Sequence, residues 1–218
     1  MPRQAAASSQ LAGRILDQAL ALAEAQDSWE ALRLHQVADA MGIPLADVLA
    51  CYAQKDDLAE AWFDCADRAA LLERDTPGFA ALPATGRLER VMMAWLDALA
   101  PHRRLTRGML AYKLEPGHLH LQLPGLARIS RTVQWFREVA GLDGRGLRRI
   151  AGESGLTLLY LSAFARWLYD ETPGGRATRG WLAQSLQRHA GCLCVGAGRM
   201  DAGRQQAPVA EAAAEDGG

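Results

Sequence analysis

Residues 32 to 58 have the sequence LRLHQVADAMGIPLADVLACYAQKDDL, in which two short helical patterns meet at a glycine. Apolar residues recur every three or four positions, as on one face of a helix. These residues are Leu34, Val37, Ala38 and Met41 in the first pattern, and Leu45, Val48, Leu49 and Tyr52 in the second. Gly42 suits the left-handed residue that ends a helix, and Pro44 suits the first turn of the next helix. The segment therefore predicts a helix-turn-helix, although an ordinary helical hairpin has the same pattern.

A spaced series of residues extends this pattern over positions 11 to 62. The series consists of Ile15, Leu16, Ala19, Leu22, Trp29, Leu32, Arg33, Leu34, Val37, Ala38, Gly42, Ile43, Tyr52, Lys55 and Leu58. It resembles the N-terminal domain of the TetR family, whose members are dimeric helical regulators. The resemblance implies an N-terminal domain that binds duplex DNA and a C-terminal domain that binds a ligand.

The same resemblance implies a set of DNA-binding residues in and around the second helix. This set comprises Arg33, Pro44, Leu45, Ala46, Asp47, Leu49, Ala50, Tyr52 and Lys55. The chain departs from the family here, because Leu49 replaces an aromatic hydroxyl that faces a phosphate and an acid, Asp47, lies in the second helix. Lys55 opens the next helix, where the family often meets a phosphate, and keeps a cation there.

Charge is distributed unevenly along a chain whose formal net charge is -1. Residues 1 to 60 contain four Lys or Arg against nine Asp or Glu, whereas residues 85 to 150 contain twelve against five. Because cations that neutralise phosphates give a DNA-binding domain its affinity, the N-terminal charge has the wrong sign. The basic region contains two clusters of arginine, namely Arg103, Arg104 and Arg107, and Arg128, Arg131, Arg145, Arg148 and Arg149. These residues are expected to form solvated helix faces or to meet an anionic ligand, a phospholipid surface or an acidic partner.

The remaining sequence predicts an all-α protein of about nine helices, because apolar residues keep recurring at helical spacing. The segment HLHLQLPG alternates apolar and polar residues, and we interpret it as a loop that leads into a helix over about Leu126 to Val139. Four parts are expected: a disordered arm over 1–10, a helix-turn-helix domain over 11–75, a ligand-binding and dimerisation domain over 85–191, and a disordered tail over 196–218.

The segment from Gly146 to Asp170 predicts the longest apolar helix of the chain. A helix that is apolar around most of its circumference is buried on more than one side, and its small residues allow close approach of another helix. We therefore expect a homodimer through the helices near 147–170 and 174–190, with burial inside one subunit as the alternative.

The C-terminal half carries a second resemblance, in the segments LDALAPHRR, TVQWFREVAGLD and LLYLSAFARWLYDETPGGRATRGWLAQSL. They are similar to accessory proteins of ubiquinone biosynthesis that share the TetR fold, have lost DNA binding and bind lipid-like ligands. That family typically has an additional amphipathic helix at the C-terminus. The final residues here, GRQQAPVAEAAAEDGG, do not predict one.

Large apolar residues in the C-terminal half are candidates for lining a ligand pocket. They are Met92, Trp95, Met109, Tyr112, Trp135, Phe136, Tyr160, Phe164 and Trp167. At helical spacing, the same residues also fit an ordinary core. The expected ligand is an apolar small molecule or a lipid.

The sequence predicts no catalytic residue, no metal site and no cofactor. The two groups of metal-binding residue types, Glu115 with His118 and His120, and His189 with Cys192 and Cys194, lack the spacing of a zinc site. The N-terminus does not resemble a signal peptide, and no apolar run reaches the length of a membrane span. A cytoplasmic location is therefore expected, with the cysteines reduced.

Together these observations predict a homodimeric, ligand-responsive transcriptional regulator that is not an enzyme. Its second helix would enter the major groove of duplex DNA, and a ligand in the C-terminal domain would change the separation of the two reading helices. The alternative is an accessory protein that binds an apolar small molecule or lipid and has lost DNA binding.

Overall fold

The computed structural model describes the backbone of residues 2–114, 119–142 and 146–193, and the side chains of residues 7–113, 125–142, 149–191 and 193. Within these ranges the chain is helical and contains no strand, which confirms the all-α prediction. The helices are α1 (Pro2–Ala25), α2 (Leu34–Met41), α3 (Leu45–Cys51), α4 (Lys55–Leu72), α5 (Ala84–Leu99), α6 (Arg103–Leu114), α7 (Leu119–Val139), α8 (Gly146–Leu168), α9 (Arg176–Arg188) and α10 (Ala190–Leu193). Among the described residues, the four-residue α10 is the one α-helix beyond the nine expected from the sequence.

The hairpin of α2 and α3 forms where the sequence predicts it. Helix α2 ends at Gly42, whose φ of 64° and ψ of 34° lie in the left-handed region. A residue with a Cβ atom there would cost roughly 1–2 kcal/mol, so glycine fixes the point at which the chain turns. Val37 of α2 and Val48 of α3 are fully buried in the core that these helices share with α1.

Two helices begin earlier than the sequence predicts. Helix α1 starts at Pro2, so residues 2 to 10 are helical and not a disordered arm. The alanines in this segment favour helix, which lets the helix extend back from its buried part.

Helix α7 starts at Leu119 and includes the segment that the sequence predicts as a loop. Pro124 lies near the N-terminal end of α7. Because proline has no backbone N–H, it removes one of the first hydrogen bonds of this helix. The predicted tail over 196–218 lies outside the described residues.

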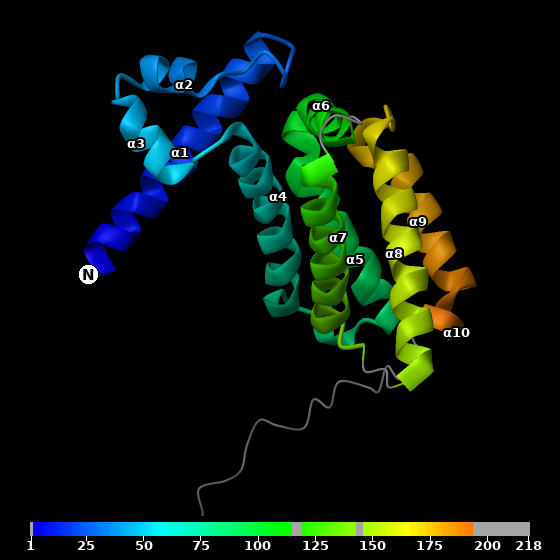
Figure 1. Cartoon of the computed structure of the whole chain (residues 1–218). Helices are drawn as coiled ribbons and strands as arrows, with labels where there is room; N and C mark the ends of the chain where they lie inside the picture. Colours follow the sequence, from blue (N-terminus) through cyan, green and yellow to red (C-terminus); the bar gives the residue numbers. More distant parts are fainter. Residues whose placement is uncertain (1, 115–118, 143–145, 194–218) are drawn as a thin grey trace, which may run out of the picture.

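Figure 1 shows α1, α2 and α3 grouped at one end of the molecule, with α4 leading from them into the bundle of α5 to α9. Helices α4 and α5 pack along one another, and two short 3-10 turns, Glu73–Asp75 and Phe79–Ala81, connect them. Trp95 of α5 lies at the centre of the bundle, with its ring centroid 5.3 Å from that of Tyr160 and 5.0 Å from that of Phe164. Helix α4 therefore belongs both to the helix-turn-helix end and to the bundle.

A buried carboxylate fixes the start of α9. Asp170 accepts hydrogen bonds from the backbone N–H and the hydroxyl of both Thr172 and Thr178, at donor–acceptor distances of 2.5 to 2.9 Å. Burial alone would raise the pKa of Asp170, but these four bonds stabilise the carboxylate and hold its pKa well below the ordinary value. Asp170 therefore holds the turn at Thr172 against the first turn of α9.

Candidate nucleic-acid interface and ligand cavity

Helix α3 exposes most of the residues that the sequence proposes for DNA contact. Leu45 is 40% exposed and Leu49 is 42% exposed, and the other exposed residues of this segment are Pro44, Ala46, Asp47 and Ala50. Val48 is the residue that anchors the helix in the core. The exposed surface of α3 therefore offers apolar side chains and one carboxylate, and it offers no side-chain hydrogen-bond donor.

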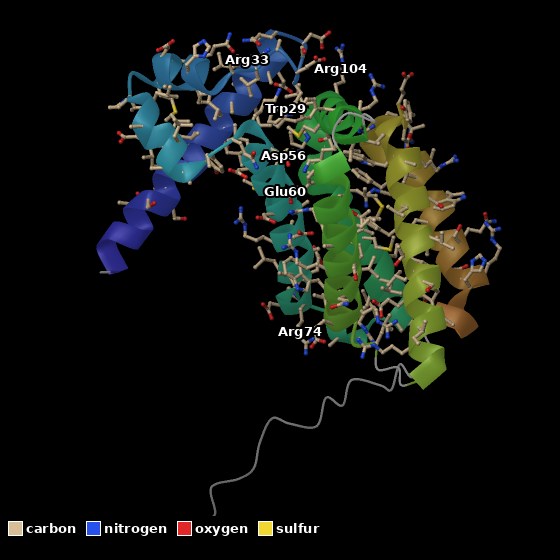
Figure 2. The ribbon with its side chains drawn as sticks, in the orientation of Figure 1. Trp29, Arg33, Asp56, Glu60, Arg74 and Arg104 are labelled. Carbon is tan, nitrogen blue, oxygen red and sulfur yellow. The ribbon has the colours of Figure 1, made fainter. Side chains whose placement is uncertain are left out.

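The two cations proposed for DNA contact are both engaged with backbone carbonyls. The guanidinium of Arg33, which is labelled in Figure 2, donates to the carbonyl oxygens of Glu30 and Leu32. The Lys55 ammonium donates to the carbonyl oxygens of Trp29, at 3.4 Å, and Glu30, at 3.1 Å. Burial, with the charge of Arg33 as a further cause, lowers the pKa of Lys55. These side chains hold the segment between α1 and α2 against the start of α4.

Tyr52, also proposed for DNA contact, lies in the interior. Its side chain is buried, and its hydroxyl donates to the carbonyl oxygen of Ala12 in α1 at 3.0 Å. Burial is the largest cause of a raised pKa at this hydroxyl. In this structure Tyr52 thus connects α1 to the end of α3.

Four of the nine acids in residues 1 to 60 contact basic residues of the C-terminal half, three of them as ion pairs with Lys or Arg. At the end of α1, Glu24 meets His102 at 2.7 Å and Asp27 meets Arg104 at 2.9 Å (Arg104 is labelled in Figure 2). In α4, both Asp56 and Glu60 meet Lys113 of α6. The uneven charge of the sequence therefore reflects pairing between its two halves more than the charge of a DNA-binding surface.

The arginine clusters of the sequence have identifiable partners where their side chains are described. Arg103 lies over the ring of Trp167 at 4.5 Å, and Arg107 lies over that of Tyr169 at 5.4 Å. Arg149 meets Glu153 within α8 at 3.8 Å. Arg145 and Arg148 lie outside the described side chains.

Helix α4 is joined to α6 and α7 by a group of charged residues that we call the α4 charge cluster. It consists of Asp56, Glu60, Asp64 and Asp67 from α4, Lys113 from α6, and Arg128 from α7. Arg128 meets Asp64 at 2.7 Å and Asp67 at 2.9 Å, and it also bonds to Glu60. Burial would raise the pKa of Glu60, but hydrogen bonds and charge from Lys113 and Arg128 lower it overall.

Asp67 connects this cluster to the aromatic core. Its carboxylate, almost completely buried, accepts from the indole N–H of Trp95 at 2.8 Å and from the hydroxyl of Thr132 at 3.0 Å, besides its bond to Arg128. One carboxylate of α4 therefore binds α5 and α7 together. Arg131, one turn further along α7, adds a longer contact of 3.5 Å to Asp64.

A cavity of about 500 Å³ lies between α4, α5, α6, α7 and α8. Apolar side chains form most of its wall, and Glu60, Lys113 and Arg128 of the α4 charge cluster also line it. The apolar residues of the wall are Phe63, Trp95, Leu110, Leu126, Ile129, Tyr160, Leu161, Phe164, Ala165 and Leu168. This size and composition suit a drug-sized apolar molecule.

Of the nine pocket residues proposed from the sequence, the structure brings three together in this wall. These are Trp95, Tyr160 and Phe164. The residues Met92, Met109, Phe136 and Trp167 are buried in the core. Trp135 lies beside Arg131, and Tyr112 lies with its ring 4.7 Å from the Lys55 ammonium.

Helix α8 carries an exposed apolar face. Its large side chains Ile150, Leu158 and Leu161 are exposed, as is Tyr169 in the turn that follows the helix. Between them lie the exposed small residues Ala151, Ser154, Ser162 and Ala165. We call these eight residues the α8 face. Such a contiguous apolar surface is typical of an interaction site.

Among the described side chains, no three His, Cys, Asp or Glu residues are placed to hold a metal ion. Of the two groups considered in the sequence, Glu115, His118, His120, Cys192 and Cys194 have no described side chains. In the same part of the chain, no helix is long and apolar enough to cross a membrane.

Comparison with solved structures identifies a similar regulator. The chain is similar to the crystal structure of the TetR transcriptional regulator from Nitrosomonas europaea, with 41% sequence identity and a TM-score of 0.74. The match covers 83% of this chain and 98% of that chain. No family model and no curated protein matches the sequence. The resemblance of the C-terminal half to ubiquinone-biosynthesis accessory proteins therefore stays a prediction.

Proposed function

Since the chain belongs to the TetR family of transcriptional regulators, we propose that it binds duplex DNA as a homodimer and releases the DNA when an apolar molecule enters the cavity. The observation that carries this proposal is the shared wall between the cavity and α4. Glu60 of α4 lines the cavity and is bonded to Lys113 and Arg128, which line it too. A ligand in this space therefore packs directly against the residues that hold α4, and it is able to favour a different placement of this helix.

The route from the cavity to the reading helix is short. Tyr112 and Lys113 are consecutive residues of α6, and they contact Lys55, Asp56 and Glu60 in the first two turns of α4. Helix α4 follows α3 after a short connection, so a shift of its first turns moves the helix-turn-helix. A ligand that favours the shifted arrangement lowers the affinity for DNA by population shift.

The homodimer is proposed through α8 and α9. The α8 face is too extensive and too poor in charge for a solvated helix surface, and Trp181 of α9 is half-buried beside it. A two-fold axis through this face would present two copies of α3 to DNA. In helix-turn-helix dimers, the two half-sites lie about one helical turn apart.

The proposed contacts of α3 with DNA are unusual because its exposed side chains lack donors. Leu45 and Leu49 are able to contact the methyl groups of thymine, and the Asp47 carboxylate is able to accept from the amino group of cytosine. Arg14 of α1 is exposed and is a candidate for a phosphate contact. We therefore expect operators rich in thymine and cytosine at the positions that α3 meets.

The test is selection of duplexes from a random-sequence pool by the full-length protein. The wild type is expected to enrich a two-fold symmetric sequence. Leu49→Asp, which places a second acid on the exposed face of α3, is expected to abolish enrichment. Leu72→Asp is the matched control, because Leu72 is exposed at the far end of α4. Equal enrichment by both variants, or none by the wild type, would contradict the proposed DNA contact.

The absence of donors on α3 also favours a second candidate function, an accessory protein that binds an apolar molecule or lipid and does not bind DNA. An organic extract of the purified protein distinguishes the two. A stoichiometric apolar compound in the extract, together with no enrichment of DNA after its removal, would favour the accessory protein. Enrichment by the extracted protein would favour the regulator, for which a cytoplasmic location follows.

A further inference from the structure

We propose that a second copy of this chain closes the mouth of the cavity, so that the ligand site is complete only in the dimer. The inference rests on the homodimer of the proposed function. It comes from two residues, Leu161 and Ala165, which line the cavity and also belong to the α8 face. The surface that meets the second copy therefore includes the edge of the ligand site.

We place the mouth of the cavity between α7 and α8, where its wall includes exposed leucines. Leu126 of α7, which is 63% exposed, stands on one side of it, and Leu161 stands on the other. The inner wall behind them is formed by buried aromatic residues such as Trp95 and Tyr160. Well-formed ligand sites bury about 70–90% of the ligand surface, and an apolar mouth open to water does not achieve this. A single subunit thus lacks one wall of its site.

The composition of the α8 face fits a second copy of the same helix. If two α8 helices cross in antiparallel orientation about residue 160, Leu158 of one copy meets Ser162 of the other. In the same arrangement Tyr169, in the turn after α8, meets Ala151. Large side chains thus face small ones on both sides of the two-fold axis, so this part of the face is complementary to itself, as a two-fold contact requires. Glu153 is the only charged residue from Ile150 to Ala165, and it lies half-buried near Arg149.

The cavity also indicates the class of ligand that the dimer encloses. The charges of its wall, on Glu60, Lys113 and Arg128, are already balanced by ion pairs, and only the buried Nε of Arg128 lacks a hydrogen-bond partner among these described groups. A charged ligand group would have to displace one of these partners, whereas an uncharged apolar molecule fills the space without doing so. The ligand is therefore an uncharged, mainly apolar compound. By linkage, dimerisation raises the affinity for the ligand by some factor, and the bound ligand raises the affinity of one subunit for the other by the same factor.

The test uses N-phenyl-1-naphthylamine, an uncharged fluorescent probe, and the full-length protein. Leu158→Glu changes the α8 face at a side chain that is 68% exposed and does not line the cavity. This variant is expected to be monomeric by analytical ultracentrifugation and to bind the probe at least about fivefold more weakly, the lower end of typical coupling. Leu72→Glu, on α4, is the matched control and is expected to bind the probe like the wild type. Circular dichroism and urea unfolding establish that both variants are folded.

A second measurement does not depend on any variant. Saturating probe is expected to lower the dissociation constant of the wild-type dimer by the same factor. A folded monomeric variant with wild-type affinity for the probe would overturn the inference, as would a dimer dissociation constant that the probe leaves unchanged. If the wild-type dimer still enriches DNA in either case, the proposed regulator stands and only the shared ligand site is refuted. A wild type that is monomeric at all concentrations would overturn both the shared site and the homodimer.

Discussion

Two acids of the α4 charge cluster contact the same arginine, but we expect their replacement to change the stability of the protein by very different amounts. Asp64 and Asp67 both accept from Arg128, at 2.7 Å and 2.9 Å. Their surroundings differ, because the side chain of Asp67 is 2% exposed and that of Asp64 is 48% exposed. We predict that Asp67→Ala strongly destabilises the protein, and that Asp64→Ala barely does.

The magnitude follows from what each change leaves behind. Asp67→Ala leaves the buried N–H of Trp95 and the hydroxyl of Thr132 without their acceptor, at about 1 kcal/mol or more each. It also removes a buried ion pair from Arg128, which brings the expected loss to about 4 kcal/mol, within the range for breaking such pairs. Asp64→Ala removes a solvated contact, whose expected worth is below about 1 kcal/mol.

Equilibrium unfolding in urea, followed by circular dichroism and tryptophan fluorescence, measures both variants. The protein concentration is kept fixed, because the stability of a dimer depends on it. The expected difference between the two free energies of unfolding is about 3 kcal/mol. If the two variants differ by less than about 1 kcal/mol, then burial does not decide the strength of these contacts and the reasoning fails.

Three further predictions concern acid stability, the fold of the hairpin and the charge of α3. The pKa of Asp170 is below its ordinary value of 3.8 in the folded protein. The ionised carboxylate therefore stabilises the fold fully at neutral pH, and this stabilisation is lost as the pH falls below the ordinary value toward the lowered pKa. Asp170→Asn is therefore less stable than the wild type at pH 7, and urea unfolding at lower pH is expected to show the gap closing below pH 3.8. Tyr52→Phe loses the bond to Ala12 and about 1 kcal/mol of stability, but its DNA affinity in a binding titration stays within twofold of the wild type; a larger loss in affinity with no loss in stability would mean that the hydroxyl contacts DNA. Asp47→Asn removes an exposed acid from α3 and is expected to raise the affinity for random-sequence duplex at low salt. The comparison is Asp39→Asn, which removes an exposed acid from α2.

Much of the helix-turn-helix was predictable because its signals are local. Gly42 and the apolar residues of α2 and α3 act within a few positions of one another, and the structure has them as the sequence indicates. The start of α7 was not predictable in this way. Alternating residues and Pro124 resemble a loop in sequence, yet the helix includes them.

The α4 charge cluster was not predictable from the sequence, because its partners are far apart along the chain. Glu60 and Lys113 are separated by 53 positions, and Glu60 and Arg128 by 68. Charge counts revealed an acidic N-terminal part and a basic C-terminal part, but not that they pair. For this reason the acids of α4 suggested a surface unsuited to DNA.

The cavity was predictable only in part. Helical spacing places Trp95, Met92 and Phe136 alike on buried faces, and it cannot distinguish a residue of the core from one that borders an empty space. Trp95 lines the cavity, while the other two lie in the core. Lys55 and Tyr52 show the same limit, because their family positions suggest DNA contact while their side chains bond to the backbone nearby.

The most direct test of the regulator is binding of the full-length protein to a labelled random-sequence duplex over a series of salt concentrations, followed by fluorescence anisotropy. We predict binding at low salt that weakens linearly on a log–log plot as salt rises, with a slope set by the number of phosphates contacted. The same protein freed of any extractable apolar compound should bind at least as tightly. The account would be contradicted if the dimeric protein, freed of any apolar compound, did not bind the duplex at the lowest salt concentration.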